Sequence, residues 1–426
     1  MSREDSATQT DRPEANGSSQ IENLEAFGPP RPTTPAHIIQ DDQEAIDIAH
    51  RLAKSFAQEA ALRDRERRLP IAELDAFSQS GLWGMTVPKA YGGAEVSYVT
   101  VGEVIKIISA ADPSLGQIPQ NHLGILDIIR LCASEEQKRF FFGEVLKGMR
   151  LGNAFSEKGS KTVGHFETRI RPHGDGYIVN GQKFYCSGAL LAHMVPVAAT
   201  DEHGQAQLAF VERDGPGLRI IDDWSSFGQR TTASGTVLLE DAFVPASHVV
   251  PAHEAYDIPT ANGAVLQIIH AGIDLGIAQA AIDETIHFVR SYTRPWIDSG
   301  QEHGYEDMYS IAQIGDLKMR LHAAEAILDR AGRTVDAAMA SPNEDSVAAA
   351  SITVAEAKVL TTEIAIQATN KLFELAGTRS TLEEYNLDRH WRNARTHTLH
   401  DPVRWKFQAI GNYYLNNIKP PRHAWI

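Results

Sequence analysis

The chain has 426 residues, a formal net charge of −15 at pH 7 and two cysteines. Its length allows two or three domains, and its negative charge argues against nucleic acid or an anionic membrane surface as a partner. Two cysteines cannot build a disulfide framework or a four-cysteine zinc site, and neither a signal segment nor a run of about 18 apolar residues is visible, so we expect a cytoplasmic protein without membrane contact.

The N-terminal third of the sequence predicts a tail followed by a helical domain. Residues 1–38 are polar and rich in Ser, Thr, Pro, Glu and Gln, which predicts a disordered tail. Over residues 39–150, apolar residues recur at three-to-four spacing, for example in 45–62 and 99–110. This pattern predicts an N-terminal helical domain.

The rest of the chain predicts a β domain and then a helical bundle. Residues 151–255 alternate with a period of two, and Asn180-Gly181 is typical of a two-residue hairpin turn. Residues 256–426 return to a helical period, with helices expected over 264–292, 308–338, 347–376 and after Pro402. We therefore predict an α+β fold. The helix over 347–376 has apolar residues on more than one face, which predicts assembly of several copies.

Residues 390–406 concentrate groups that can carry chemistry. His390, His397 and His400 precede Asp401-Pro402, which predicts a helix cap with proline at the first helical position. A histidine before a helix start lies where backbone N–H groups gather, and this favours chemistry on an electron-rich intermediate. The residues alone leave open that His400 is simply exposed. His397 and His400 lack a third ligand at a usual offset except Asp401, so we reject a metal site.

Four segments resemble the acyl-CoA dehydrogenase superfamily. They are 153–157 and 181–187, which resemble its two flavin contacts, and 227–230 and 391–395, all in register across about residues 40–420. The resemblance implies an N-terminal helical domain, a small central β-barrel and a C-terminal four-helix bundle.

Two departures resemble the flavin-dependent monooxygenase branch of this superfamily, which includes dibenzothiophene monooxygenase and the SfnB-type sulfur-acquisition oxidoreductases. At the position of the dehydrogenases' catalytic glutamate, the chain has His400-Asp401. Where those enzymes have a glycine-rich turn near a dinucleotide, residues 374–380 contain one glycine, which leaves less room for a pyrophosphate. Arg379 in that segment offers a guanidinium to a single phosphate.

The resemblance also implies roles for individual residues. Expected flavin contacts are Ser156 near N5 of the ring, Tyr185 and Ser187 along the ring, and Arg294 and Arg379 at the phosphate. From the residues alone, Tyr185 is equally suited to the barrel core, and either arginine to an ion pair between subunits.

The expected catalytic residues centre on His400, whose ordinary pKa near about 6.5 suits a general acid or base. Asn121 and His122, expected on a loop facing the flavin, would contact the reactive oxygen or the substrate; a helix-start role is the alternative. Tyr91 would close the substrate pocket or pack in its turn. His390 and His397 are expected on a helix surface or in packing.

The whole pattern predicts a homotetrameric monooxygenase that uses reduced FMN, supplied by a separate NAD(P)H-dependent flavin reductase, to insert one atom of O2 into a small organosulfur compound. FAD is the less expected cofactor. One alternative is an FAD-dependent acyl-CoA dehydrogenase with Asp401 as its base. A second is a non-catalytic protein of this fold that serves in an assembly.

Overall fold

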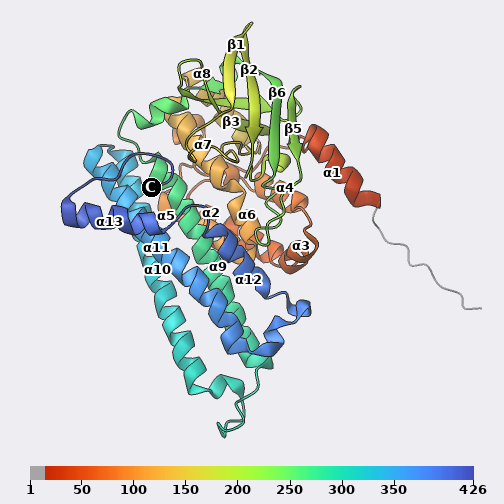
Figure 1. Cartoon of the computed structure of the whole chain (residues 1–426), viewed down its shortest axis with the longest axis vertical. Coiled ribbons are helices and arrows are strands. Elements are labelled where there is room, and N and C mark those ends of the chain that lie inside the picture. The colour runs from red at the N-terminus through yellow and green to blue at the C-terminus, as the bar shows by residue number, and fades with distance from the viewer. Residues whose placement is uncertain (1–14) are drawn as a thin grey trace, which may run out of the picture.

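The computed structural model describes residues 15–426, and side chains from residue 20 (Figure 1). After α1 (Ala15–Phe27), a helical part contains α2 (Asp42–Phe56), α3 (Ala60–Glu66), α4 (Ile71–Gln79), α5 (Tyr98–Ala111), α6 (Pro113–Gln117), α7 (Pro119–Cys132) and α8 (Glu135–Leu146). Side chains define several of these boundaries. Ser97 caps α5 by accepting from the Thr100 amide, and Ser134 forms a capping box with Gln137 at the start of α8.

The central part is a seven-stranded sheet in the order β5-β6-β2-β1-β3-β4-β7, drawn at the top of Figure 1. Its strands are β1 (Arg169–His173), β2 (Gly176–Lys183), β3 (Met194–Thr200), β4 (Ala206–Glu212), β5 (Leu218–Ile221), β6 (Thr236–Pro245) and β7 (Val249–Val250). All neighbours pair antiparallel except β1 and β3. Strands β4 and β6 also contact each other, so the sheet curls.

The prediction of a turn at Asn180-Gly181 was wrong. The hairpin between β1 and β2 turns at residues 174–175, and Asn180 lies within β2, where the register with β6 shifts between Val179 and Gly181. Gly181 has φ +154, and a Cβ there would lie 2.4 Å from the side-chain oxygen of Thr168. The glycine therefore serves a β-bulge with a close backbone approach, which uses the same residue types as a turn.

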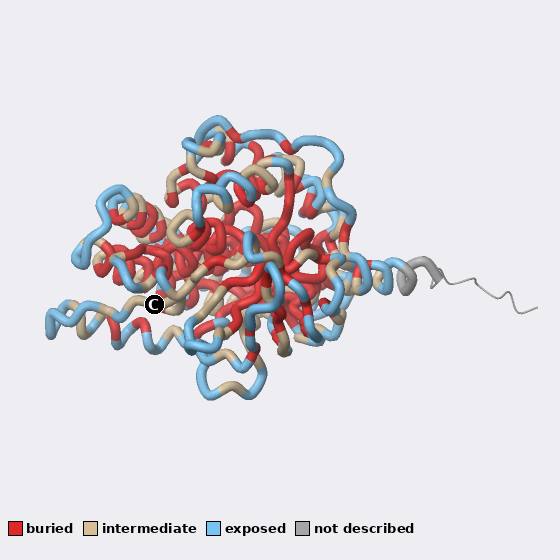
Figure 2. The backbone as a smooth tube through the Cα atoms, turned by 90° about the horizontal axis from the view of Figure 1, so that it is seen from above, coloured by how far each residue is buried: buried red, intermediate tan, exposed pale blue. Residues whose placement is uncertain are grey.

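The C-terminal part is helical. It contains α9 (Asn262–Tyr292), α10 (Met308–Ala340), α11 (Glu344–Ala376), α12 (Asp388–His397) and α13 (Arg404–Asn416). Helices α9, α10 and α11 pack together with α5, and α13 lies on α11. Buried residues gather in the interior of the molecule (Figure 2). Within the bundle, α9 and α11 are mostly buried, whereas most residues of α10 and α13 are intermediate or exposed. The predicted fold class is thus confirmed, with α12 as an additional helix that the sequence pattern did not predict.

Helix α9 is long and apolar enough to cross a membrane by length and composition, but 83% of its most apolar 18-residue window is buried inside the protein. It is surrounded by α5, α7, α10, α11 and α12. A helix that is apolar on all sides suits the centre of a large core, and α9 has that place here.

The prediction of a disordered tail over residues 1–38 differs from the structure from residue 15 onward, where α1 begins. Residues 1–14 lie outside the described part. Helix α1 packs against β5 and the 3₁₀ turn Ala189–Leu191, and Leu24 is 5% exposed. The buried guanidinium of Arg213 donates to the carbonyl oxygens of Leu24 and, at 3.0 Å, Glu25. The low average hydrophobicity of the segment predicted disorder, although its few apolar residues and its carbonyl groups are enough to dock it on the sheet.

Segment 153–157 is tied to β2 by a buried ion pair. Lys183 Nζ lies 2.6 Å from Glu157 Oε1, and their side chains are 0% and 6% exposed. The Glu157 carboxylate also accepts from the amides of Glu167 and Thr168 and from the Thr168 hydroxyl. Burial alone would raise the pKa of Glu157, but these donors lower it to about 2.

We expect Leu24→Ala to lower the free energy of unfolding by about 2–3 kcal/mol, because it removes a buried leucine from the α1 contact. Phe27→Ala is the matched control on the same helix, since Phe27 is 68% exposed and exposed sites cost within about 0.5 kcal/mol. Denaturant unfolding measures both. Equal effects would show that α1 does not dock.

We expect Glu157→Gln to destabilise the protein at pH 7 by about 3 kcal/mol, because it leaves the Lys183 ammonium buried without its carboxylate. The folded pKa of Glu157 is depressed, so its stabilisation is present above about pH 4.5 and is lost as the pH falls toward 2. The difference between the two proteins should therefore narrow in unfolding curves measured from pH 7 down to pH 3. A difference that does not change with pH would contradict the pairing.

Candidate active site

The two segments predicted to contact a flavin lie side by side. The Phe184 amide donates to the Ser156 carbonyl at 2.9 Å, and the Asn153 side-chain amide donates to the Tyr185 carbonyl at 3.3 Å. Lys183 Nζ donates to the Phe155 carbonyl at 3.0 Å. The end of strand β2 and residues 153–157 therefore form one continuous backbone edge, on which Ser156 is half-buried.

Tyr185 projects from this edge in an unusual backbone conformation. Its φ is +61°, which is rare for a residue with a large side chain, and its side chain is 51% exposed beside Phe184 and Trp224. A strained exposed aromatic is typical of a binding surface. It does not lie in the sheet core, so the alternative of a core tyrosine does not describe its position.

Ser187 belongs to a buried group of hydroxyls next to this edge. Its Oγ lies 2.7 Å from Ser234 Oγ, which lies 2.7 Å from Thr232 Oγ1, and Thr232 donates to the Gln229 carbonyl. Asn153 Oδ1 and both side-chain polar atoms of Gln229 are buried without a hydrogen-bond partner in the described structure. Unpaired buried amides are costly, so they point to a polar ligand. Hydroxyl and amide groups beside an aromatic fit the polar edge and flat face of a flavin ring.

His400 and Asp401 lie on the helical side of the structure, in the turn between α12 and α13. The His400 side chain is 36% exposed, and its Nδ1 lies 3.3 Å from Asp401 Oδ1. Asp401 is 4% exposed, and its other oxygen lies 3.3 Å from Lys406 Nζ. With Nδ1 directed to the carboxylate, Nε2 is the nitrogen of His400 that remains for a ligand.

The prediction that Asp401 caps a helix was wrong. Helix α13 begins at Arg404, and its N-cap position, Val403, has no side-chain cap. Burial raises the pKa of Asp401, but its contact with His400 and the ammonium groups of Lys358 and Lys406 lower it well below its ordinary value. Asp401 is therefore a buried counter-ion, because its own chain brings Lys406 back onto it from the first turn of α13.

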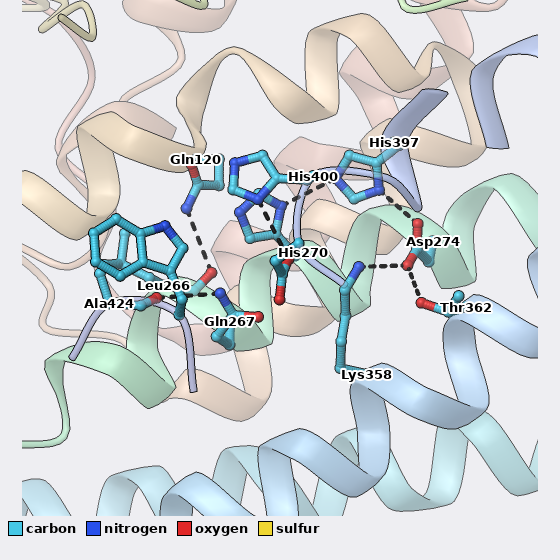
Figure 3. Close-up of polar contacts among 12 residues, drawn as sticks. Gln120, Leu266, Gln267, His270, Asp274, Lys358, Thr362, His397, His400 and Ala424 are labelled. Atoms are coloured by element: carbon cyan, nitrogen blue, oxygen red, sulfur yellow. Dashed lines mark hydrogen bonds and ion pairs between the residues drawn. The ribbon is translucent and has the colours of Figure 1, made fainter. Parts of the chain in front are cut away.

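Behind His400 lies a group of buried ionisable residues, shown in Figure 3. The His270 ring lies against His400 with centroids 4.0 Å apart, and His270 Nδ1 is 3.0 Å from His397 Nε2. His397 Nδ1 is 2.5 Å from Asp274, which also pairs with Lys358 Nζ at 2.6 Å. His397 is thus buried in this group and not on a helix surface, while His390 is buried elsewhere with Nε2 unpaired within the described structure.

Sequence reasoning missed His270, Asp274 and Lys358. The available signal was an ionisable residue inside an apolar helix: Asp274 lies between Ile273 and Leu275, and Lys358 between Ala357 and Val359. A buried charge needs a partner. The partners, however, come from α9, α11 and α12, so only the packing of three helices identifies them.

The prediction that Asn121 and His122 lie on a loop was wrong. Both lie near the start of helix α7, which agrees with the helix-start alternative. His122 is 0% exposed, accepts from the Leu151 amide through Nδ1 at 3.1 Å, and its Nε2 lies 2.8 Å from the Trp83 carbonyl. Burial lowers its pKa to about 4. Both ring nitrogens are therefore occupied by backbone, while Asn121 is half-buried. On the same turn, Gln120 faces the His270–His400 region and donates to the Leu266 carbonyl (Figure 3).

Tyr91 lies at a different place from the predicted pocket contacts. Its hydroxyl donates to Glu135 at 2.9 Å at the start of α8, and its ring contacts Phe142. These contacts match the packing alternative. The pocket role of Tyr91 stays a prediction.

The two predicted phosphate ligands lie together at the far end of the bundle. Arg294 and Arg379 are both exposed, and the Arg379 guanidinium lies 4.7 Å from the Tyr292 ring and donates to the Tyr385 hydroxyl at 2.7 Å. Tyr292 and His270 are at opposite parts of α9, 22 residues apart. At 1.5 Å per residue that separation is about 33 Å. One chain therefore does not bring these arginines to its own His400.

Three family models match the chain in sequence. Acyl-CoA dehydrogenase, N-terminal domain, matches residues 40–149; the middle domain matches 154–242; and the C-terminal domain matches 268–405. Solved structures agree. The FMN-bound structure of TdsC from Paenibacillus sp. A11-2 superposes with a TM-score of 0.85 at 32% identity, covering 90% of this chain and 100% of that one. Methanesulfinate monooxygenase MsuC from Pseudomonas fluorescens gives 0.84 at 29% identity, with 89% and 99% covered.

Curated relatives have similar coverage. Dibenzothiophene monooxygenase from Rhodococcus erythropolis is 32% identical over 397 residues, which is 89% of this chain and 95% of the relative. The probable FMNH2-dependent monooxygenase SfnC from Pseudomonas putida is 31% identical over 387 residues, with 88% and 96% covered. The chain is an enzyme of the acyl-CoA dehydrogenase superfamily and belongs to its flavin-dependent monooxygenase branch.

Proposed function

We propose that this enzyme takes reduced FMN from a separate NAD(P)H-dependent flavin reductase and transfers one atom of O2 to the sulfur of a small organosulfur substrate. The second oxygen atom leaves as water, and the flavin is oxidised. The observation that carries the proposal is the pair His400 and Asp401, at the position where the dehydrogenases have a catalytic carboxylate. Relatives named for FMNH2 dependence and for sulfur compounds support the cofactor and the substrate class.

The state of Asp401 supports oxygenation over dehydrogenation. Removal of an α-proton from an acyl thioester requires a carboxylate that reaches the substrate and binds a proton. Asp401 is 4% exposed, is paired with Lys406, and has a strongly lowered pKa. It is therefore a weak base in a closed position, while the His400 imidazole, a general acid-base group, is 36% exposed and can reach a ligand.

The residues on the sheet side would hold the flavin. Tyr185 would lie on the ring, and Ser156, Ser187 and the Asn153 amide would bond its polar edge. The bound reduced flavin supplies the two electrons that activate O2. His400 Nε2 would hold or deliver a proton beside the reacting oxygen, and Asp401 would keep the proton of His400 on Nδ1.

The position of the arginines supports a shared site. The length of an FMN molecule is much smaller than the distance from His400 to Arg379 on the same chain. A second copy of the chain would therefore supply the arginines to the phosphate of an FMN bound beside His400. Exposed apolar residues support assembly: Trp296, Ile297, Trp405, Phe407, Tyr414 and Leu415. Helix α11, whose several apolar faces predicted a tetramer, is covered by α9, α10 and α13 within one chain. The homotetramer and a cytoplasmic location remain part of the proposal.

We expect Arg379→Ala to weaken binding of reduced FMN at least about tenfold, because it removes charge-assisted hydrogen bonds to the phosphate. Arg333→Ala is the control, since Arg333 is also exposed and on the bundle, paired with Asp329. Anaerobic titration measures both, and wild type should prefer reduced FMN over oxidised FMN and FAD. Purification with stoichiometric FAD would refute the cofactor assignment, and no flavin binding at all would favour the non-catalytic alternative.

We expect His400→Ala to uncouple the enzyme. Reduced flavin is still oxidised, but it reduces O2 to hydrogen peroxide, and the amount of product per flavin oxidised falls about 100-fold. His287→Ala, an exposed histidine on α9, is the control. Asp401→Asn keeps an acceptor for His400 Nδ1 and should retain oxygenation in the folded protein. Coupled turnover by His400→Ala beside an inactive Asp401→Asn would favour the dehydrogenase alternative.

A further inference from the structure

The buried group behind His400 has a defined chain of contacts from solvent to core. It runs from His400 through the His270 ring to His397, Asp274 and Lys358, with Thr362 Oγ1 donating to Asp274 at 2.9 Å (Figure 3). His270, His397, Asp274 and Lys358 are all between 0% and 3% exposed. Only His400, at the outer end, reaches solvent.

Such a chain is expensive to bury. A buried ion pair generally contributes less to stability than apolar residues of the same size, because both charges lose their hydration. The surrounding positions of α9 and α11 are apolar, so leucine or methionine would fill the same space. The charges therefore serve a purpose other than stability, and the exposed end of the chain is the candidate catalytic histidine.

The hydrogen-bond directions follow from Asp274. Its carboxylate only accepts, so His397 carries its proton on Nδ1 and, when neutral, presents an accepting Nε2. His270 Nδ1 must then donate to His397. Burial holds the pKa of His270 well below its ordinary value, helped by His400, His397, Lys358 and Lys406, and burial also lowers the pKa of His397. Both inner rings are thus neutral, each in one tautomer.

The ionisable groups around the two inner rings and His400 come from several elements. They are His270 and Asp274 of α9, Lys358 of α11, His397 of α12, Asp401 of the turn and Lys406 of α13.

We infer that Lys358, Asp274, His397 and His270 are positioning residues for His400. The buried ion pair fixes one tautomer of His397 and one of His270, and it keeps the His270 ring neutral and oriented against His400. This inference rests on the proposed role of His400. Its consequence is that the proton needed at the site resides on His400 and not on a ring behind it.

Loss of Lys358 alone should reverse this arrangement. Lys358 is one of the groups that lower the pKa of His397, so without it the unpaired Asp274 carboxylate draws a proton onto His397. His397 Nε2 then donates, and His270 must change tautomer to accept. A positive charge now lies one ring from His400, where it disfavours protonation of His400.

The test uses diethyl pyrocarbonate, which acylates unprotonated imidazole, on the purified protein without flavin. Peptide mass spectrometry gives the modification rate of His400 as a function of pH. In Lys358→Met we expect the midpoint of this profile to fall by about one pH unit. In the double variant Asp274→Asn/Lys358→Met, which removes both charges and keeps an acceptor for His397, the midpoint should return to the wild-type value. Product per reduced flavin should fall at least about threefold in the single variant and recover in the double variant.

Lys318→Met is the matched control, because Lys318 also pairs with an aspartate of α9, Asp283, but on the surface. If Lys358→Met does not fold, Thr362→Val, which removes one hydrogen bond from Asp274, should shift the midpoint in the same direction. An unchanged midpoint in the folded variants, or no recovery in the double variant, would overturn the inference. Because the modification needs no flavin, its result stands even if the protein proves not to be a monooxygenase.

Discussion

The ion pair between Asp274 and Lys358 joins α9 and α11, the two long buried helices at the centre of the molecule. Lys358 Nζ lies 2.6 Å from the Asp274 carboxylate, and both side chains are buried. Two charges at that depth are tolerated only when each is satisfied, so α9 and α11 must pack in one register. That packing also sets where His270 of α9 lies relative to His397 and His400. The position of the candidate catalytic histidine thus depends on a contact in the interior of the bundle.

The proposed site is divided between two parts of the chain that contribute different chemistry. The sheet edge offers an exposed tyrosine, hydroxyls and unpaired amides, which suit a flat polar ligand. The helical side offers histidines and carboxylates arranged around buried ammonium groups, which suits proton transfer. The C-terminal segment closes the helical side, since the Trp425 and Ala424 carbonyls accept from Lys406 and Gln267.

Under the proposed function, the same division accounts for the difference between this site and that of a dehydrogenase. A carboxylate that is locked by Lys406 and His400 is unsuited to act as a free base, yet it is well suited to orient an imidazole. In the proposed function, His400-Asp401 at this position of the fold, combined with Lys406 on the next helix, replaces proton abstraction by support of a histidine. The chemistry is set by the environment of the carboxylate more than by its presence.

The sequence by itself determined the helical, β and helical parts and the two segments that meet at the sheet edge. These depend on local periodicity and on short motifs, which a single chain displays directly. It also singled out His400, because the histidine stands beside a carboxylate in a recognisable segment. It misplaced the Asn180-Gly181 turn and the Asp401 cap, since the residues that favour turns and caps also suit a β-bulge and a buried counter-ion.

Only the tertiary structure decided the role of Asp401, the docking of α1 and the existence of the chain behind His400. Asp274 lies 84 residues before Lys358 and 123 residues before His397. Asp274 and Lys358 are also embedded in apolar sequence. No local pattern relates them. Their partners are chosen by the cost of leaving a charge alone in a dry core, and that cost exists only once the helices have packed.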